Sequence, residues 1–313
     1  MTAKTEPVQR EPVKAAPAAP RSRSRAAETA RRAWSDSSGR IAAVLLGLIV
    51  LAALFAPLLA PSDPTTQQLT DANLAPSWLG GHGGHLLGTD TLGRDVFGRM
   101  VYGLRTSLMV GLITATASAV IGLLLGLVAG YYENSVGMVL MRLADIQFAI
   151  PFVAVGVALA AVVGPGIVKL MIILAVWGWV NYARTIANSV SQVKRSEFVT
   201  AARTIGARTP AILFRHIAPS VLGPVIILWS TSAGILVLVE SALSLLGLGV
   251  QPPGFSLGSM LADSRTTLRL AWWATVFPGL AIMAIVVAFN LLGDALRDAF
   301  NPSVRTRHDP ELW

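Results

Sequence analysis

The sequence predicts an all-α integral membrane protein with about six spanning helices, and three observations lead to this prediction. Of the 313 residues, 53% are hydrophobic and 13% are charged, whereas charged residues make up about 25% of an ordinary soluble domain. Six apolar runs are each long enough to cross a hydrocarbon core of about 30 Å as a helix. The net charge of +8 comes from basic residues in a terminal segment and in loops between these runs.

Residues 1–40 precede the first apolar run. They are rich in Ala, Pro, Arg and Ser and show no apolar periodicity, so we expect a disordered, basic cytoplasmic tail. Its arginines could contact anionic lipid headgroups, and membrane lipid is therefore an expected partner. No basic face is interleaved with stacking aromatic residues, so we expect no binding of nucleic acid.

The first run, residues 41–60, is longer than the apolar core of a signal peptide and starts later, which predicts a transmembrane helix. The polar segment 61–105 carries four aspartates against three arginines and is expected outside the membrane, because inside loops carry a positive excess. The five further predicted spans are residues 108–131, 138–163, 167–186, 221–249 and 273–292.

The loop 187–220 fixes the predicted orientation. It contains five Lys or Arg residues against the single acid Glu197, which places it in the cytoplasm. With six spans both termini are then cytoplasmic as well. Residues 106–297 form the main transmembrane domain of five helices, and 298–313 form a C-terminal tail.

Small residues within the spans suggest helix packing, and charged residues within them suggest ion pairing or a substrate path. Gly122, Gly126 and Gly130 recur every four residues and predict a helix face that another backbone approaches closely. Arg142 and Asp145 are three apart, and we expect them to pair on adjacent turns. Glu240, with Ser241 and Ser244, is a candidate for a substrate path or gate, because an unpaired acid facing a cavity could attract an ammonium group. An interfacial acid in contact with water remains the alternative.

The sequence contains no motif typical of a catalytic or cofactor-binding site. The chain has no G-x-x-x-x-G-K-[ST] sequence, so we expect that it does not hydrolyse ATP by itself. It has no cysteine, and His82 and His85 lack further ligands at metal-binding spacing, so no metal site is expected. His216 has no recognisable triad partner. We therefore expect a protein with no catalytic residues and no cofactor of its own.

The cytoplasmic loop has the most informative local pattern. Residues 197–205 can form a short helix that Gly206 ends in a left-handed conformation. A second short helix would start with Thr209 as N-cap and Pro210 at its first position, and end before Pro219. Two such helices could offer a partner protein a knob of small side chains. The alternative is a surface helix that only returns the chain to the membrane.

This loop resembles the signature of bacterial ABC importer membrane subunits, which reads Glu-Ala-Ala, three residues, Gly, nine residues, Ile, any residue, Leu-Pro. Here Thr200 and Ala218 replace the Glu and Leu, and His216 replaces the Ile. The resemblance implies that this loop seats in a groove of an ATPase subunit. The residues implied to make this coupling contact are Thr200, Ala201, Ala202, Gly206, Ala207, His216 and Pro219.

Three further stretches resemble the dipeptide/oligopeptide/nickel permease family, specifically its C-type, second permease subunit. They are LGTDTLGRDVFGR at 87–99 with the following Tyr102-Gly103, ESALSLLGLGVQPP at 240–253, and FNLLGDALRD at 289–298. Together they extend the resemblance over residues 41–302.

The resemblance implies a type I ABC importer transmembrane fold in a bacterial inner membrane. The implied partners are a homologous second permease forming a heterodimer, two cytoplasmic ATPases that bind ATP and Mg, and an external peptide-binding protein. Di- or oligopeptides would cross by alternating access. Nickel or another small solute as cargo, and a non-transporting membrane scaffold, remain alternatives.

Overall fold

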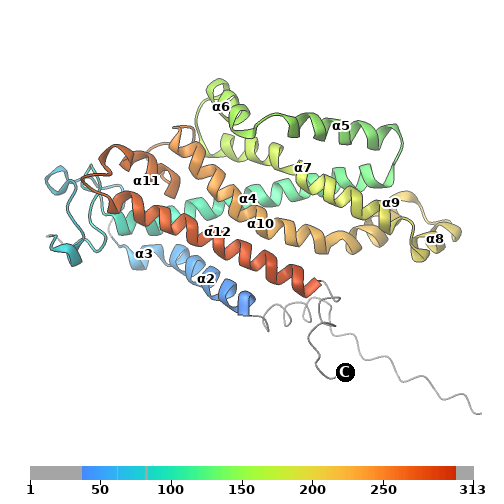
Figure 1. Cartoon of the computed structure of the whole chain (residues 1–313), viewed down its shortest axis with the longest axis horizontal. Helices are drawn as coiled ribbons and strands as arrows, with labels where there is room; N and C mark the ends of the chain where they lie inside the picture. The colour runs from blue at the N-terminus through green and yellow to red at the C-terminus, as the bar shows by residue number, and fades with distance from the viewer. Residues whose placement is uncertain (1–36, 62, 82–83, 301–313) are drawn as a thin grey trace, which may run out of the picture.

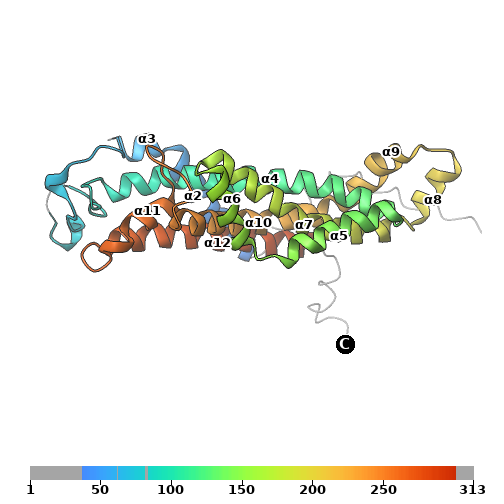
Figure 2. The ribbon, with the colours of Figure 1, turned by 90° about the horizontal axis from the view of Figure 1, so that it is seen from above.

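The computed structural model describes residues 37–61, 63–81 and 84–300. Within these ranges the regular secondary structure is helical, apart from an isolated bridge between Thr89 and Asp95. The long helices run side by side along one axis, which gives an elongated bundle (Figures 1 and 2). The two predicted tails consist mainly of residues 1–36 and 301–313, which lie outside the described residues.

Five described helices are long and apolar enough to cross a membrane, and a bent pair can supply a sixth crossing. The predicted all-α membrane fold is therefore confirmed. The five are α2 (Ser37–Leu54), α4 (Val96–Tyr131), α7 (Ile167–Val193), α10 (Ala218–Leu245) with an extension from Thr209, and α12 (Trp273–Phe300). The bent pair is α5 (Ser135–Ala149) and α6 (Phe152–Val163), and the short helices include α3 (Ala56–Leu59), α8 (Glu197–Thr204), α9 (Thr209–Ala211) and α11 (Leu257–Ser264).

The third predicted span, 138–163, is not one straight helix. Helices α5 and α6 meet at an angle of 86°, and Ile150 between them has extended backbone angles of φ −97° and ψ 129°. Pro151 explains the break, because a proline ring disfavours helical angles at the residue before it and removes a backbone donor.

Helix α4 begins at Val96, twelve residues before the apolar run 108–131 from which this span was predicted. The side chain of Asp95 accepts a hydrogen bond from the backbone N–H of Gly98 at 2.6 Å. This N-cap satisfies one of the unpaired donors of the first turn. The predicted span followed the apolar run, whereas the helix begins about three turns before that run.

The fifth predicted span also begins too late, since its helix starts at Thr209 and runs through Pro219 to Leu245. Residues 212–217 form a π-helical segment, η3 (Ile212–Ile217), and the N–H of Ala218 donates to the C=O of Leu213, five residues earlier. This widened turn lets the helix continue into a residue that has no N–H. Thr209 is the first helical residue after Arg208, not the N-cap.

The glycine face of α4 lies against α7, as its spacing predicted. A Cβ added at Gly126 would lie 2.8 Å from both the carbonyl oxygen of Ala183 and the Cβ of Ile186, and Gly122 and Gly130 face equally close neighbours. Contact this close is possible only without side chains. Helix α10 packs against α12 and α4, while α2 packs against α12.

Candidate functional site

Helix α8 and the turn after it form a knob at one end of the bundle (Figures 1 and 2). The first described residues of α2 and the last of α12 lie toward the same end. Val199 and Ala202 of α8 are buried in a cluster with Ile212 and Ile217. These contacts hold the knob on the start of the long helix that leads back into the membrane.

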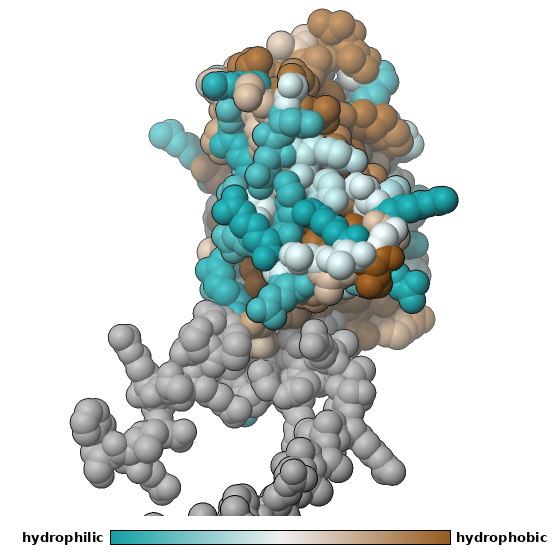
Figure 3. Space-filling view, turned by 90° about the vertical axis from the view of Figure 1, so that its right-hand side faces the viewer, coloured by the Kyte–Doolittle hydropathy of each residue, from teal (hydrophilic) through white to brown (hydrophobic). Residues whose placement is uncertain are grey.

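The outward surface of the knob is partly apolar. The side chains of Phe198, Ile205 and Phe214 are 48%, 84% and 59% exposed. Hydrophilic residues cover much of this end of the molecule, with hydrophobic residues among them (Figure 3). Exposed apolar side chains of this size within a polar surface are typical of a protein contact.

Gly206 ends α8 in the predicted left-handed conformation, with φ of +81°. Its N–H donates to the C=O of Arg203 at 2.9 Å, and the N–H of Ala207 donates to the C=O of Ala202 at 3.0 Å. These two bonds are those of a Schellman motif, which satisfies the last carbonyl groups of a helix. The predicted cap is confirmed, and it sets the direction in which the chain leaves α8.

The seven predicted coupling residues lie at this end but do not share one surface. Thr200 and Ala201 are exposed on α8, and the Thr200 hydroxyl donates to the C=O of Ser196 at 3.2 Å. Ala202 instead faces the protein interior. Gly206 and Pro219 are exposed, whereas Ala207 and His216 are partly buried.

Tyr131, at the end of α4, anchors the loop and was not singled out in the sequence. The Nζ of Lys194 donates to its carbonyl oxygen at 2.6 Å. Lys194 and Arg203 each place their charge 5.4 Å from the centre of its ring. Such cation–π contacts stabilise by about 0.5–1 kcal/mol at exposed sites, so Tyr131 links the knob to a spanning helix.

A cavity of about 230 Å³ lies among α4, α7, α10 and the bend between α5 and α6. Most of its surface is apolar, but polar side chains interrupt it midway along α7. The Nε2 of Gln147 donates to the C=O of Trp177 at 2.9 Å, while the Nε1 of Trp179 donates to the Oε1 of Gln147 at 3.1 Å. The polar lining residues are Ser118, Gln147, Asn181, Tyr182 and Ser232.

Glu240 is buried within the chain and does not face either described cavity. Its Oε1 accepts hydrogen bonds from the hydroxyls of Ser244 and Ser256, each at 2.7 Å, and its Oε2 accepts one from Ser241 at 3.4 Å. Ser256 is also the N-cap of α11. The expected unpaired acid is thus a hydrogen-bonded link between α10 and α11, because α11 folds back over it.

The expected pair of Arg142 and Asp145 does not form either. The Oδ1 of Asp145 accepts a hydrogen bond from the Nη2 of Arg184 on α7 at 2.6 Å. The guanidinium of Arg184 also lies 4.8 Å from the centre of the Phe148 ring. Because α5 packs along α7, the nearest cation for Asp145 belongs to the neighbouring helix.

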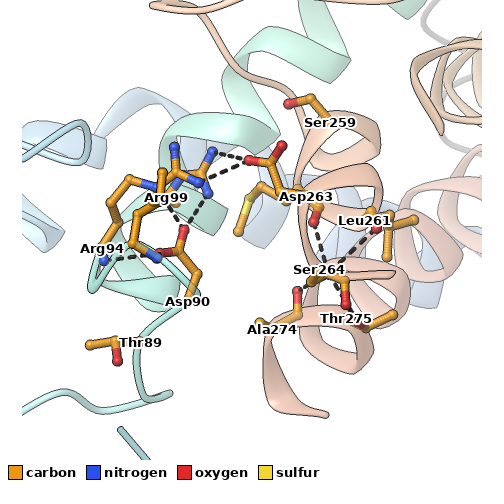
Figure 4. Close-up of polar contacts among 12 residues, drawn as sticks. Thr89, Asp90, Arg94, Arg99, Ser259, Leu261, Asp263, Ser264, Ala274 and Thr275 are labelled. Atoms are coloured by element: carbon orange, nitrogen blue, oxygen red, sulfur yellow. Dashed lines mark hydrogen bonds and ion pairs between the residues drawn. The ribbon is translucent and has the colours of Figure 1, made fainter. Parts of the chain in front are cut away.

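A partly buried ion network joins residues 90–99 to α11 (Figure 4). Asp90 accepts from the Nε of Arg94 at 2.7 Å and from the Nη1 of Arg99 at 2.6 Å. Asp263 accepts from the Nη2 of the same two arginines, at 2.9 and 3.1 Å. Arg94, Arg99 and Asp263 also line a second cavity, of about 580 Å³.

Comparison with known proteins decides the family. Residues 122–306 match the family described as binding-protein-dependent transport system inner membrane component. The chain belongs to this family. Residues 24–76 match a second family, the N-terminal transmembrane domain of oligopeptide transport permease C. The chain is therefore a transport permease subunit and a multi-pass inner-membrane protein.

The permease is similar to named subunits over most of its length. It is 40% identical to the di/tripeptide transport system permease protein DppC of Pseudomonas aeruginosa, covering 88% of this chain and 91% of that one. It is 38% identical to the dipeptide transport system permease protein DppC of Bacillus subtilis, covering 84% and 80%. It is 36% identical to the glutathione transport system permease protein GsiD of Pectobacterium atrosepticum, covering 88% and 92%.

The ion network gives a structural reason for part of the sequence pattern on which the family resemblance was based. Asp90, Arg94 and Arg99 all belong to the LGTDTLGRDVFGR stretch, and their shared partner is Asp263. No local signal marked Asp263, which lies 164 residues beyond Arg99. Two arginines close together in this stretch, of which Arg99 is buried, are the signal that could have prompted a search for a distant acid, since buried charges are paired.

Proposed function

We propose that this permease subunit moves peptides inward across the bacterial inner membrane. The observation that carries the proposal is the 40% identity to a di/tripeptide permease over about nine tenths of both chains. The second and third relatives are named for a dipeptide and for glutathione, which are both short peptides. Short peptides are therefore the cargo class that these relatives support.

The proposed transport unit contains three kinds of partner protein. A homologous second permease completes the membrane domain, two cytoplasmic ATPases bind ATP and Mg, and an external binding protein delivers the peptide. The apolar surface of the α8 knob and the adjacent η3 supports contact with an ATPase, because Phe198, Ile205 and Phe214 stay 48–84% exposed in the described part of the chain. ATP-driven closure of the ATPases would then switch the permeases between inward-open and outward-open states.

The polar lining of the 230 Å³ cavity favours transport over a scaffold function. Gln147, Asn181 and Ser232 line this space from three different helices, about midway along the apolar helix α7. Polar groups at this depth are costly in lipid and usually face an interior or a water-filled path. A scaffold that only anchors a partner has no need of them.

Uptake of a labelled dipeptide tests the proposal. The permease would be reconstituted with its second permease, its ATPases and its binding protein, and ATP-dependent uptake would be measured. Peptide uptake that requires this chain is the expected result. Uptake of nickel instead of peptide would assign another cargo, and no uptake of any solute would favour the scaffold.

The coupling contact has its own test. Ile205→Asp places a charge on the most exposed apolar side chain of the knob, whereas Val136→Asp changes a residue of α5 that is 50% exposed. We expect Ile205→Asp to insert normally but to lose co-purification of the ATPases and uptake, and Val136→Asp to retain both. Full ATPase binding by Ile205→Asp would show that α8 is not the docking knob.

A further inference from the structure

Arg184 and Asp145 form a partly exposed ion pair inside the membrane domain. Their side chains are 37% and 52% exposed. Arg184 lies 17 residues into α7, about 26 Å from its external end at 1.5 Å per residue. This is within a hydrocarbon core of about 30 Å. Charges at such a depth face a protein interior or a water-filled cavity, because lipid solvates them poorly.

The ion pair borders the 230 Å³ cavity. Phe148 lines the cavity and also lies against the guanidinium of Arg184. Asn181 lines it too, and it precedes Arg184 by three residues, so both lie on the same face of α7. Figures 1 and 2 both show α5 alongside α7 at this level. The pair therefore lies at the cytoplasmic mouth of the cavity.

The pair leaves binding capacity unused. Within the described chain, one nitrogen of Arg184, Nη2, bonds one oxygen of Asp145. A guanidinium has five N–H donors in a fork that fits both oxygens of a carboxylate. Phe148 covers one face of this guanidinium and leaves its edge partly exposed. A carboxylate arriving from the cavity can thus replace the single bond to Asp145 with two.

We propose that Arg184 binds the terminal carboxylate of a peptide on its way through the permease, with Asp145 as the counter-ion that it displaces. This inference rests on the proposed function, since every linear peptide carries this group whatever its side chains. Because the peptide carboxylate has to displace Asp145 from Arg184, the affinity of Arg184 for the peptide stays low. Asp145 regains Arg184 as the peptide leaves, and a transport path requires binding that is favourable yet easily reversed.

The test measures uptake of one dipeptide by the reconstituted complete importer, with the binding protein at saturation. We expect Arg184→Gln to lower the maximal rate about tenfold, which corresponds to the loss of ~1.4 kcal/mol, while Arg184→Lys, which keeps the charge but not the two-pronged donor, has an intermediate rate. The matched control is Arg297→Gln, because Arg297 also pairs with an acid, Asp294, but both side chains are more than 60% exposed and lie away from the cavity. This control should transport normally.

A charge exchange separates carboxylate binding from a simple latch between α5 and α7. The double variant Arg184→Asp with Asp145→Arg preserves the ion pair but moves the cation to α5. We expect it to remain impaired in uptake while it binds the ATPases normally. Full recovery in the exchanged variant, or an unchanged rate in Arg184→Gln, would overturn the inference. Failure of the unaltered importer to take up any peptide would instead refute the proposed function.

Discussion

The close contact between α4 and α7 gives the sharpest prediction. In Gly126→Ala the new Cβ lies 2.8 Å from the carbonyl oxygen of Ala183 and from the Cβ of Ile186, whereas carbon atoms in normal contact are about 3.5–4.0 Å apart. The two helices must therefore separate by about 1 Å. Overpacking of this kind costs about 1–3 kcal/mol, against a gain in helix propensity of at most about 1 kcal/mol.

Gly47→Ala is the matched control, because it is the same chemical change on α2 at a position with no atom within 4 Å of the added Cβ. Reversible unfolding in mixed micelles titrated with SDS would give both free energies. We expect Gly126→Ala to lose about 1–3 kcal/mol relative to Gly47→Ala, because the gain in helix propensity is common to both variants and only Gly126→Ala is overpacked. Equal stability of the two variants would refute the packing argument. Equal stability with lost uptake would indicate instead that this face slides during transport.

Three further predictions concern the ion network, the knob and the buried acid. Arg99→Met should destabilise the permease by about 3–5 kcal/mol in the same unfolding assay, because it leaves Asp90 buried with one cation fewer. The control is Arg297→Met, which removes an exposed ion pair and should lower stability by less than about 1 kcal/mol. Similar losses of stability in Arg99→Met and Arg297→Met would contradict a stabilising function of the ion network. Gly206→Val should weaken co-purification of the ATPases, because a branched residue at φ +81° is strained by about 1–2 kcal/mol. Gly206→Asn should retain co-purification. Equal co-purification by the two variants would show that the left-handed conformation of residue 206 does not matter for ATPase binding. Glu240→Leu should destabilise by about 1–3 kcal/mol, because buried hydroxyls lose their acceptor. Glu240→Gln keeps one acceptor oxygen and should lie nearer the unaltered protein, and a reversed order would show that the hydrogen bonds from the serine hydroxyls do not stabilise the fold.

The sequence predicted those features that depend on neighbours along the chain. Apolar runs of sufficient length located the spans, the four-residue spacing of Gly122, Gly126 and Gly130 located a packing face, and Gly206 located the end of α8. Each of these depends on local geometry or on the thickness of a bilayer. The boundaries were less accurate, because the N-cap of Asp95 and the π-helical segment lie outside the apolar runs that were used to draw them.

The features that could not be predicted depend on residues far apart in the sequence. Asp145 pairs with Arg184, 39 residues away, and not with the arginine on its own helix. Glu240 is buried because α11 places the Ser256 hydroxyl on its carboxylate. Which charges meet is decided by how the helices pack, and hydrophobic periodicity alone does not specify that packing.

The helix that continues without a break from Thr209 to Leu245 has a mechanical consequence. At 1.5 Å per residue its 37 residues measure about 55 Å, so in the proposed importer it would act as a lever between the knob and the opposite end of the bundle. If the helix pivots near one end, a tilt of about 10° displaces the other end by roughly 10 Å at this length. Glu240 joins the far part of this helix to α11. A small rotation where the proposed ATPase presses on the knob would thereby be amplified into a displacement large enough to open or close a peptide-sized entrance at the opposite end.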